Sequence, residues 1–174
     1  MFKDFNISSF KKTKPPSDNS FDTDQEIKAL KKIPLRKDFV KKYDNIEKAF
    51  EQTAKDNNIK DYDKKIAAKL IKDSAPVILE LKKYHNRPRP YELDKNLKAV
   101  KMKSMNTPSY PSGHSAQSVL IASVLKDKYG KSSAFMQTAK NISDSRNIAH
   151  AHYKSDSVNG TKLGKQLYKH IKKT

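Results

Sequence analysis

Apolar residues recur at helical spacing along most of this 174-residue chain, and this pattern constrains the fold more than any other feature. The clearest example is the stretch 63–84, where apolar side chains return every three or four positions on or near one helix face. They are Ile66, Ala67, Leu70, Ile71, Ala75, Ile78, Leu79 and Tyr84. No convincing stretch alternates polar and apolar residues as a strand does. Since this length suits one domain, we predict an all-α, single-domain bundle of about six to seven helices.

Capping residues and helix breakers mark the ends of the expected helices. Ser112 is a good N-cap, and Gly130 ends the helix that follows it. The expected helices cover approximately residues 24–33, 39–54, 63–84, 93–100, 112–130 and 134–150, with a last helix that begins at 155. Pro76 is expected to kink the third helix or to split it in two. Residues 1–22 have few apolar positions, so we expect a mobile tail there and a folded domain over residues 23–174.

The chain is strongly basic, with 37 Lys and Arg against 19 Asp and Glu and a formal net charge of +18. A nucleic-acid-binding track is one interpretation of this charge. We favour a lysine-rich, solvated surface instead, because the positive charge is spread along the whole chain. Nucleic acid is therefore a disfavoured partner, whereas peripheral contact with an anionic membrane surface stays open. The sequence also leaves the oligomeric state open, a homodimer included.

Several classes of protein are excluded by what the sequence lacks. The longest apolar run, residues 118–125, is far shorter than the roughly 20 residues of a membrane-spanning helix. The first 20 residues contain no apolar segment like that of a secretory signal, so we expect a cytoplasmic protein. The absence of cysteine excludes disulfides, thiolate metal sites and cysteine nucleophiles.

Three segments combine loop-forming residues with groups that bind anions. The segment 82–90 carries Lys82 and, next to proline, Arg89, whose planar guanidinium can grip a phosphate group through two hydrogen bonds. The segment 111–114, with sequence PSGH, lies at an expected helix N-terminus, where free backbone N–H groups form a phosphate seat. The segment 145–156 brings together an arginine, an imidazole and a carboxylate.

In this order the segments resemble the three-part signature of the type 2 phosphatidic acid phosphatase superfamily, which also includes bacterial class A acid phosphatases and vanadium haloperoxidases. The first motif is matched by Lys82, Arg89 and Pro90, and the second by residues 111–114. The third is matched by Ser145, Arg146, His152 and Asp156. The resemblance covers about residues 75–165 and rests on three ordered blocks, which makes it far more specific than one short motif.

The resemblance implies a metal-independent phosphatase without a cofactor, acting on phosphate monoesters or on lipid or isoprenoid phosphates. His152 would attack phosphorus and form a phosphohistidine, Asp156 would hold the other ring nitrogen, and His114 would protonate the leaving alkoxide. The expected phosphate-binding residues are Lys82, Arg89, Ser112, Gly113 and Arg146. Since one histidine must start neutral and the other protonated, a bell-shaped pH profile is expected.

Two other functions remain open at this point. The same cradle could hold vanadate in a haloperoxidase, or the chain could be a basic, non-enzymatic module that binds polyanions or membranes. Arg87 could be a phosphate ligand, a residue behind the site or a surface charge, and we favour the last two. His150 and His152 do not suggest a metal pair, because residues two apart on a helix do not face each other.

Overall fold

The computed structural model describes residues 1–173, and over that range the chain is helical and contains no strand. The α-helices are α1 (Ser8–Lys12), α2 (Phe21–Lys31), α3 (Lys37–Asp44), α4 (Ile46–Asp56), α5 (Lys65–His85), α6 (Pro90–Leu93), α7 (Gly113–Tyr129), α8 (Ser132–Ile148) and α9 (Lys154–Lys173). A 3₁₀-helix, η1, covers Lys103–Asn106. Seven of these α-helices have eight residues or more, while α1 and α6 are short. The predicted all-α bundle is confirmed.

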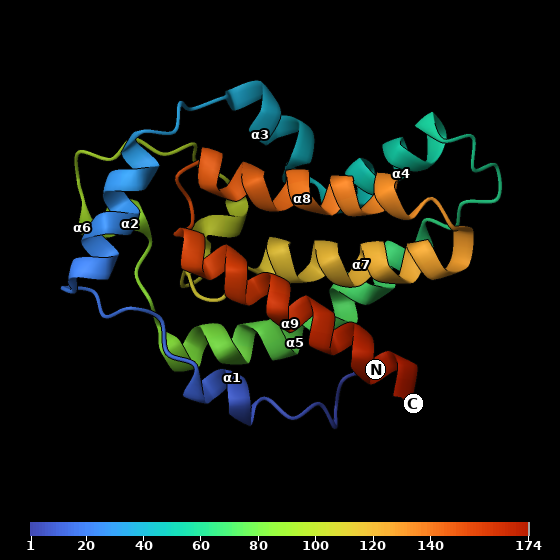
Figure 1. Cartoon of the computed structure of the whole chain (residues 1–174), viewed down its shortest axis with the longest axis horizontal. Helices are drawn as coiled ribbons and strands as arrows, with labels where there is room; N and C mark the ends of the chain where they lie inside the picture. The colour runs from blue at the N-terminus through green and yellow to red at the C-terminus, as the bar shows by residue number, and fades with distance from the viewer. Residues whose placement is uncertain (174) are drawn as a thin grey trace.

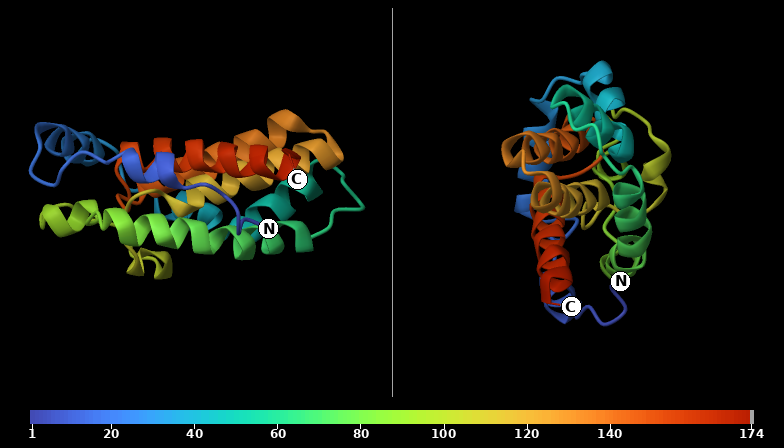
Figure 2. Two further views of the ribbon diagram at one scale, coloured as in Figure 1. Left: turned by 90° about the horizontal axis from the view of Figure 1, so that it is seen from below. Right: turned by 90° about the vertical axis from the view of Figure 1, so that its right-hand side faces the viewer.

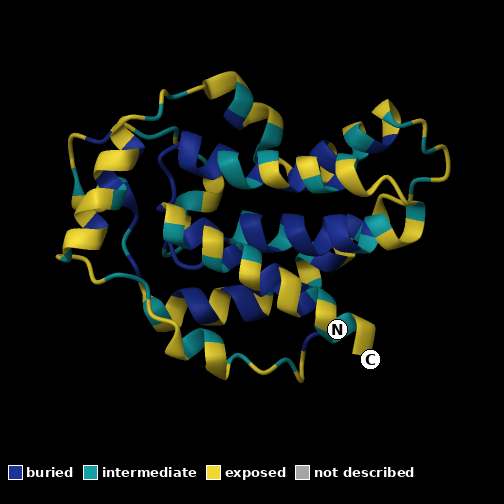
Figure 3. Ribbon diagram, viewed as in Figure 1, coloured by how far each residue is buried: buried dark blue, intermediate teal, exposed yellow. Residues whose placement is uncertain are grey.

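Helix α7 lies at the centre of the bundle, between α8 and α9 (Figure 1). Helix α5 packs along another side of α7 (Figure 2). Because helices surround it, α7 is buried over most of its length (Figure 3), including every residue from 118 to 123. The apolar run at 118–125 is therefore the centre of the hydrophobic core, formed mainly with side chains from α4, α5, α8 and α9.

Two glycines one turn apart allow α9 to pack closely against the first turns of α7. A Cβ atom added at Gly160 would overlap the carbonyl oxygen of Ser112, and one added at Gly164 would overlap that of Ala116. The amide of Ser112 also donates to the carbonyl oxygen of Asp156, at 3.0 Å. This close contact sets the start of α9 beside the start of α7, where the second and third sequence motifs lie.

Two helix predictions differ from the structure, and a third is narrowed. The helix expected over 39–54 is two helices that meet at Asn45, whose side chain accepts from the amide of Lys48 and so caps α4. The short helix expected near 93–100 is wrong, since regular turns occur instead at 90–93 and 103–106. Pro76 lies within α5 and does not split that helix. In the turn that precedes Pro76, the carbonyl oxygen of Ile71 accepts from the side chain of Gln117 in α7.

The N-terminal segment, residues 1–22, for which a mobile tail is expected, contacts the bundle at several points. Phe2 is buried against the core, and its ring lies 6.1 Å from that of His170 near the end of α9. Farther along, the carbonyl oxygen of Phe10 bonds His85, and that of Thr13 accepts from the Tyr110 hydroxyl. The few apolar residues of this segment, too sparse to predict a helix, therefore suffice to hold it along the bundle.

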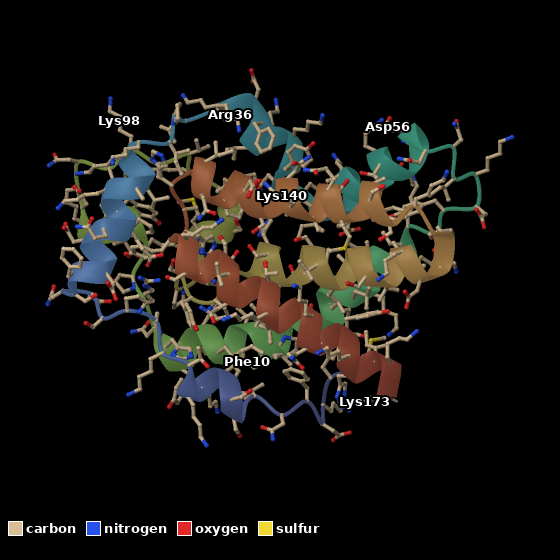
Figure 4. The ribbon with its side chains drawn as sticks, viewed as in Figure 1. Phe10, Arg36, Asp56, Lys98, Lys140 and Lys173 are labelled. Atoms are coloured by element: carbon tan, nitrogen blue, oxygen red, sulfur yellow. The ribbon has the colours of Figure 1, made fainter. Side chains whose placement is uncertain are left out.

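Charged side chains project from the periphery of the molecule, among them Lys98 and Lys173 (Figure 4). Within residues 1–173, no helix has both the length and the apolar character that crossing a membrane requires.

Candidate anion-binding site

The three motifs meet at one end of the bundle, where four long helices begin or end (Figure 1). Helices α5 and α8 end here and carry Lys82 and Arg146 in their last turns, while α7 and α9 begin here. Helix N-termini carry partial positive charge and unpaired N–H groups, so two of them strengthen the cationic character of this end. Residues far apart in the sequence thus form one cluster.

The ring of His152 is held from both sides, and its neighbours define its hydrogen positions. Nδ1 lies 3.1 Å from Asp156 Oδ2, and Nε2 lies 3.0 Å from the Arg89 guanidinium nitrogen Nη1. A carboxylate accepts and a guanidinium donates, so Nδ1 carries the hydrogen and Nε2 presents its lone pair. His152 is 4% exposed, and Asp156 is fully buried.

Besides His152, three other groups donate hydrogen bonds to the Asp156 carboxylate. Arg87 Nη1 donates to Oδ1 at 2.8 Å, while the Ser109 hydroxyl and the amide of Tyr153 donate to Oδ2. Burial alone raises the pKa of Asp156, but the bonds from His152, Arg87 and Ser109 outweigh it and lower the pKa. The carboxylate is therefore ionised and fixed in orientation.

Arg87 is buried behind the site, which excludes the surface-charge interpretation. Besides Asp156, its guanidinium pairs with Glu26 of α2 at 3.1 Å and lies 3.7 Å from the centre of the Tyr153 ring. The arginine thereby connects α2 to the carboxylate that orients His152. Tyr153 and Tyr110 are themselves buried, as core residues are.

Arg89 and Lys82 reach the cluster from the first motif, and both bond to backbone carbonyls. Arg89 Nε donates to Thr107 O at 3.0 Å and Nη2 to Ser104 O at 3.2 Å. Lys82 Nζ donates to Pro108 O at 2.5 Å. Backbone carbonyls of the segment 104–109 therefore occupy part of the donor capacity of both cations.

Arg146 and His114 form the more exposed side of the cluster, next to Asp44 at the end of α3. Arg146 Nη1 lies 3.0 Å from Asp44 Oδ1, whereas its Nη2 is buried and has no hydrogen-bond partner. His114 Nε2 lies 2.9 Å from the carbonyl oxygen of Asp44. Since a carbonyl only accepts, Nε2 carries the hydrogen and Nδ1 is the nitrogen free to exchange a proton.

Ser112 and Gly113 open α7 at the floor of the cluster. The Ser112 hydroxyl caps the helix by accepting from the amide and the hydroxyl of Ser115, which leaves its own O–H group available as a donor. A Cβ at Gly113 would lie 3.9 Å from Cε of Lys82, so the first backbone turn of α7 lies next to the lysine.

Burial lowers the pKa values of three basic groups in the cluster. It lowers the pKa of His152 to about 3 and, with help from Arg146, that of His114 to about 4. The pKa of Lys82 falls to about 7 through burial and the charge of Arg89. Both histidines are therefore neutral at pH 7, and Lys82 is only partly charged. A bound anion opposes these shifts and favours proton uptake.

All eight residues predicted for the site lie in this cluster. The sequence analysis missed Asp44, Ser109 and Glu26, which lie outside the three motifs. Each touches a motif residue, namely Arg146, Asp156 and Arg87 respectively. Ser109 lies two residues before the second motif, which is a weak signal, while Asp44 and Glu26 are acidic residues among many on helix surfaces.

His150 and His152 do not act as a pair in the structure. The two ring nitrogens of His150 face the carbonyl oxygens of Lys98 and Ile33, at 2.7 and 2.8 Å. Across residues 1–173, no three His, Cys, Asp or Glu side chains are grouped so that they could hold a metal ion.

Comparison with known proteins gives no match, either to protein-family models or among curated protein sequences.

Proposed function

We propose that this chain is a metal-independent phosphatase that hydrolyses phosphate monoesters through a phosphohistidine at His152, and that it belongs to the type 2 phosphatidic acid phosphatase superfamily. The observation that carries the proposal is the state of the His152 ring, with Asp156 at Nδ1 and an unprotonated Nε2 inside a ring of cations. A neutral imidazole whose Nε2 lone pair accepts from a guanidinium becomes a nucleophile suited to phosphorus when a bound phosphoryl group takes the place of that donor.

In the proposed reaction, His152 Nε2 bonds to phosphorus while the bond from phosphorus to the ester oxygen breaks. The leaving alkoxide takes a proton from Nδ1 of His114. Water then attacks the phosphohistidine and gives a proton to His114, and inorganic phosphate leaves with His152 restored. Asp156 stabilises the positive charge that the His152 ring carries during the transfer.

The cations supply the electrostatic part of the proposal. Phosphoryl transfer spreads negative charge over the three non-bridging oxygens, and fixed donors around them lower the barrier. Lys82, Arg89 and Arg146 are buried and converge from the first and third motifs, and Arg146 Nη2 has no partner within the protein. An anion would satisfy that nitrogen and replace the carbonyl acceptors of the other two.

Substrate binding must also charge His114, because its pKa of about 4 leaves it neutral in the free protein at pH 7. The negative phosphoryl group raises that pKa and so provides the general acid. The proposal therefore includes an acidic pH optimum, since proton uptake becomes harder as the pH rises.

The proposal leaves the alcohol portion of the ester open, and lipid and isoprenoid phosphates stay admissible. The basic surface is compatible with attraction to anionic membranes, which would bring a lipid ester to the site from the membrane surface.

An assay of the purified protein on a panel of phosphate monoesters, with chelator present, tests the proposal. Turnover by the wild type should fall by about 10³-fold or more in His152→Ala. His170→Gln, at the far end of α9, is the matched control and should retain activity. Full turnover by His152→Ala would contradict the proposal, as would activity that appears only with vanadate, peroxide and halide.

A further inference from the structure

Asp44 stands where the buried cluster meets solvent. Its side chain is 44% exposed, against 1% for Arg146 and 17% for His114. Its Oδ1 lies 3.0 Å from Arg146 Nη1 and 3.9 Å from His114 Nε2, and its carbonyl oxygen accepts from the same His114 nitrogen. The carboxylate is thus adjacent to both the cationic seat and the proposed general acid.

The direction of the reaction places the leaving group on the side of Asp44. In phosphoryl transfer the attacking and leaving atoms lie roughly in line, on opposite sides of phosphorus. His152 attacks from the buried side, where its side chain is 5% exposed. The leaving oxygen therefore lies at Nδ1 of His114, which must protonate it, and the rest of the alcohol extends towards the solvent-facing side of the cluster. Asp44 borders that side from the other edge of the same imidazole ring.

We propose that Asp44 is a specificity-determining residue that selects phosphate monoesters with a neutral or cationic leaving group. This inference rests on the phosphatase function proposed above. A leaving group with its own negative charge would lie next to the Asp44 carboxylate, and like charges brought together at a partly buried site repel. Diphosphates belong to this disfavoured class, because their leaving group is itself a phosphate.

The basic surface of the protein does not cancel this selection. A net charge of +18 attracts every anion, but at physiological ionic strength charges farther away than about 8 Å are largely screened. Asp44 acts inside that distance. The surface lysines therefore raise the encounter rate for every phosphate ester, whereas Asp44 makes kcat/KM depend on the charge of the leaving group.

Three esters of similar size test the proposal: 2-aminoethyl, 2-hydroxyethyl and 2-carboxyethyl phosphate, whose leaving groups are cationic, neutral and anionic. The measured quantity is the ratio of kcat/KM for the cationic ester to that for the anionic ester. This ratio should fall by about tenfold from wild type to Asp44→Asn, because the substitution removes the charge and keeps the size. The ratio cancels any effect of the substitution on the phosphate group, which all three esters share.

Glu47→Gln is the matched control, since it removes an equal charge from an exposed position three residues away. It should keep the wild-type ratio within about twofold, as remote surface charges are screened. If wild type and Asp44→Asn hydrolyse the esters with the same ratio, or if the ratio falls as much in Glu47→Gln as in Asp44→Asn, the role of Asp44 is overturned. The phosphatase proposal is unaffected by either result. If the wild type hydrolyses none of the three esters, the phosphatase proposal fails and this inference fails with it.

Discussion

His152 Nδ1 lies 3.1 Å from Asp156 Oδ2, and this one contact determines which nitrogen of the ring can act as a nucleophile. The carboxylate keeps the hydrogen on Nδ1, so the lone pair is on Nε2, which faces the cations. The pair is buried, so water does not compete for either partner.

The substitution Asp156→Asn should therefore lower kcat by about 10² to 10⁴-fold, because an amide no longer enforces the tautomer or stabilises the charged ring. Steady-state kinetics, with circular dichroism to verify folding, measure the effect. Asp144→Asn on the surface of α8 removes another paired carboxylate and should change kcat little. Equal kinetics for Asp156→Asn and wild type would show that this contact is only structural.

Anion affinity should weaken as the pH rises through 7, because the pKa of Lys82 is about 7 in the free protein. Below that pH the lysine is charged and attracts the ligand, and above it the charge is lost. Sulfate is a suitable probe since it does not titrate here, and calorimetry should find about tenfold weaker binding at pH 8 than at pH 6. Lys82→Arg keeps its charge throughout and should remove most of this difference. A flat affinity in the wild type would rule out Lys82 as a ligand.

The free energy of unfolding should decrease between pH 7 and pH 5 because of the two site histidines. Their pKa values of about 3 and 4 lie below the unfolded value, so the unfolded state binds more protons and acid favours it. The loss by pH 5 is about 2 kcal/mol for each histidine. Denaturant titrations should therefore find a smaller acid loss in His114→Gln than in the wild type. The same loss in both would mean that His114 is not held neutral.

Close packing of α9 on α7 should make Gly164 intolerant of a side chain. Gly164→Ala forces a methyl group into the carbonyl of Ala116 and should cost about 1–3 kcal/mol of stability. Thermal unfolding should show a fall of roughly 2–12 °C for a chain of this size. Lys165→Ala, on the exposed side of the same helix, is the control. An unchanged melting temperature for Gly164→Ala would indicate a looser interface than the structure has.

Local sequence signals predict most of the helices. The features that they do not predict depend mainly on contacts between residues far apart in the sequence. Helical spacing and the Ser112 and Gly130 caps predict the ends of α7 because these signals act within one turn. The break at Asn45 has a local signal, since Asn45 caps α4, but helical spacing continues across it. The path of the segment 1–22 depends on contacts with distant residues, such as that of Phe2 with the core. No local pattern encodes those contacts.

The residues of the candidate site also fall into two groups, those that the sequence predicts and those that only the packing of helices brings in. Spacing predicts the motif residues, but it does not tell which way Arg87 points, since a step of two residues from Arg89 is compatible with several orientations. Asp44 and Glu26 reach the site only through the packing of α3 and α2 against it. A single sequence contains no record of such long-range pairs.

Trapping the intermediate tests the central claim most directly. The wild type is mixed with a monoester labelled at phosphorus, quenched within milliseconds under alkaline conditions that preserve phosphohistidine, and mapped by mass spectrometry. We expect label on His152 in the wild type and no labelled protein in His152→Ala. Turnover without label on His152, or label on another residue, would contradict the central claim.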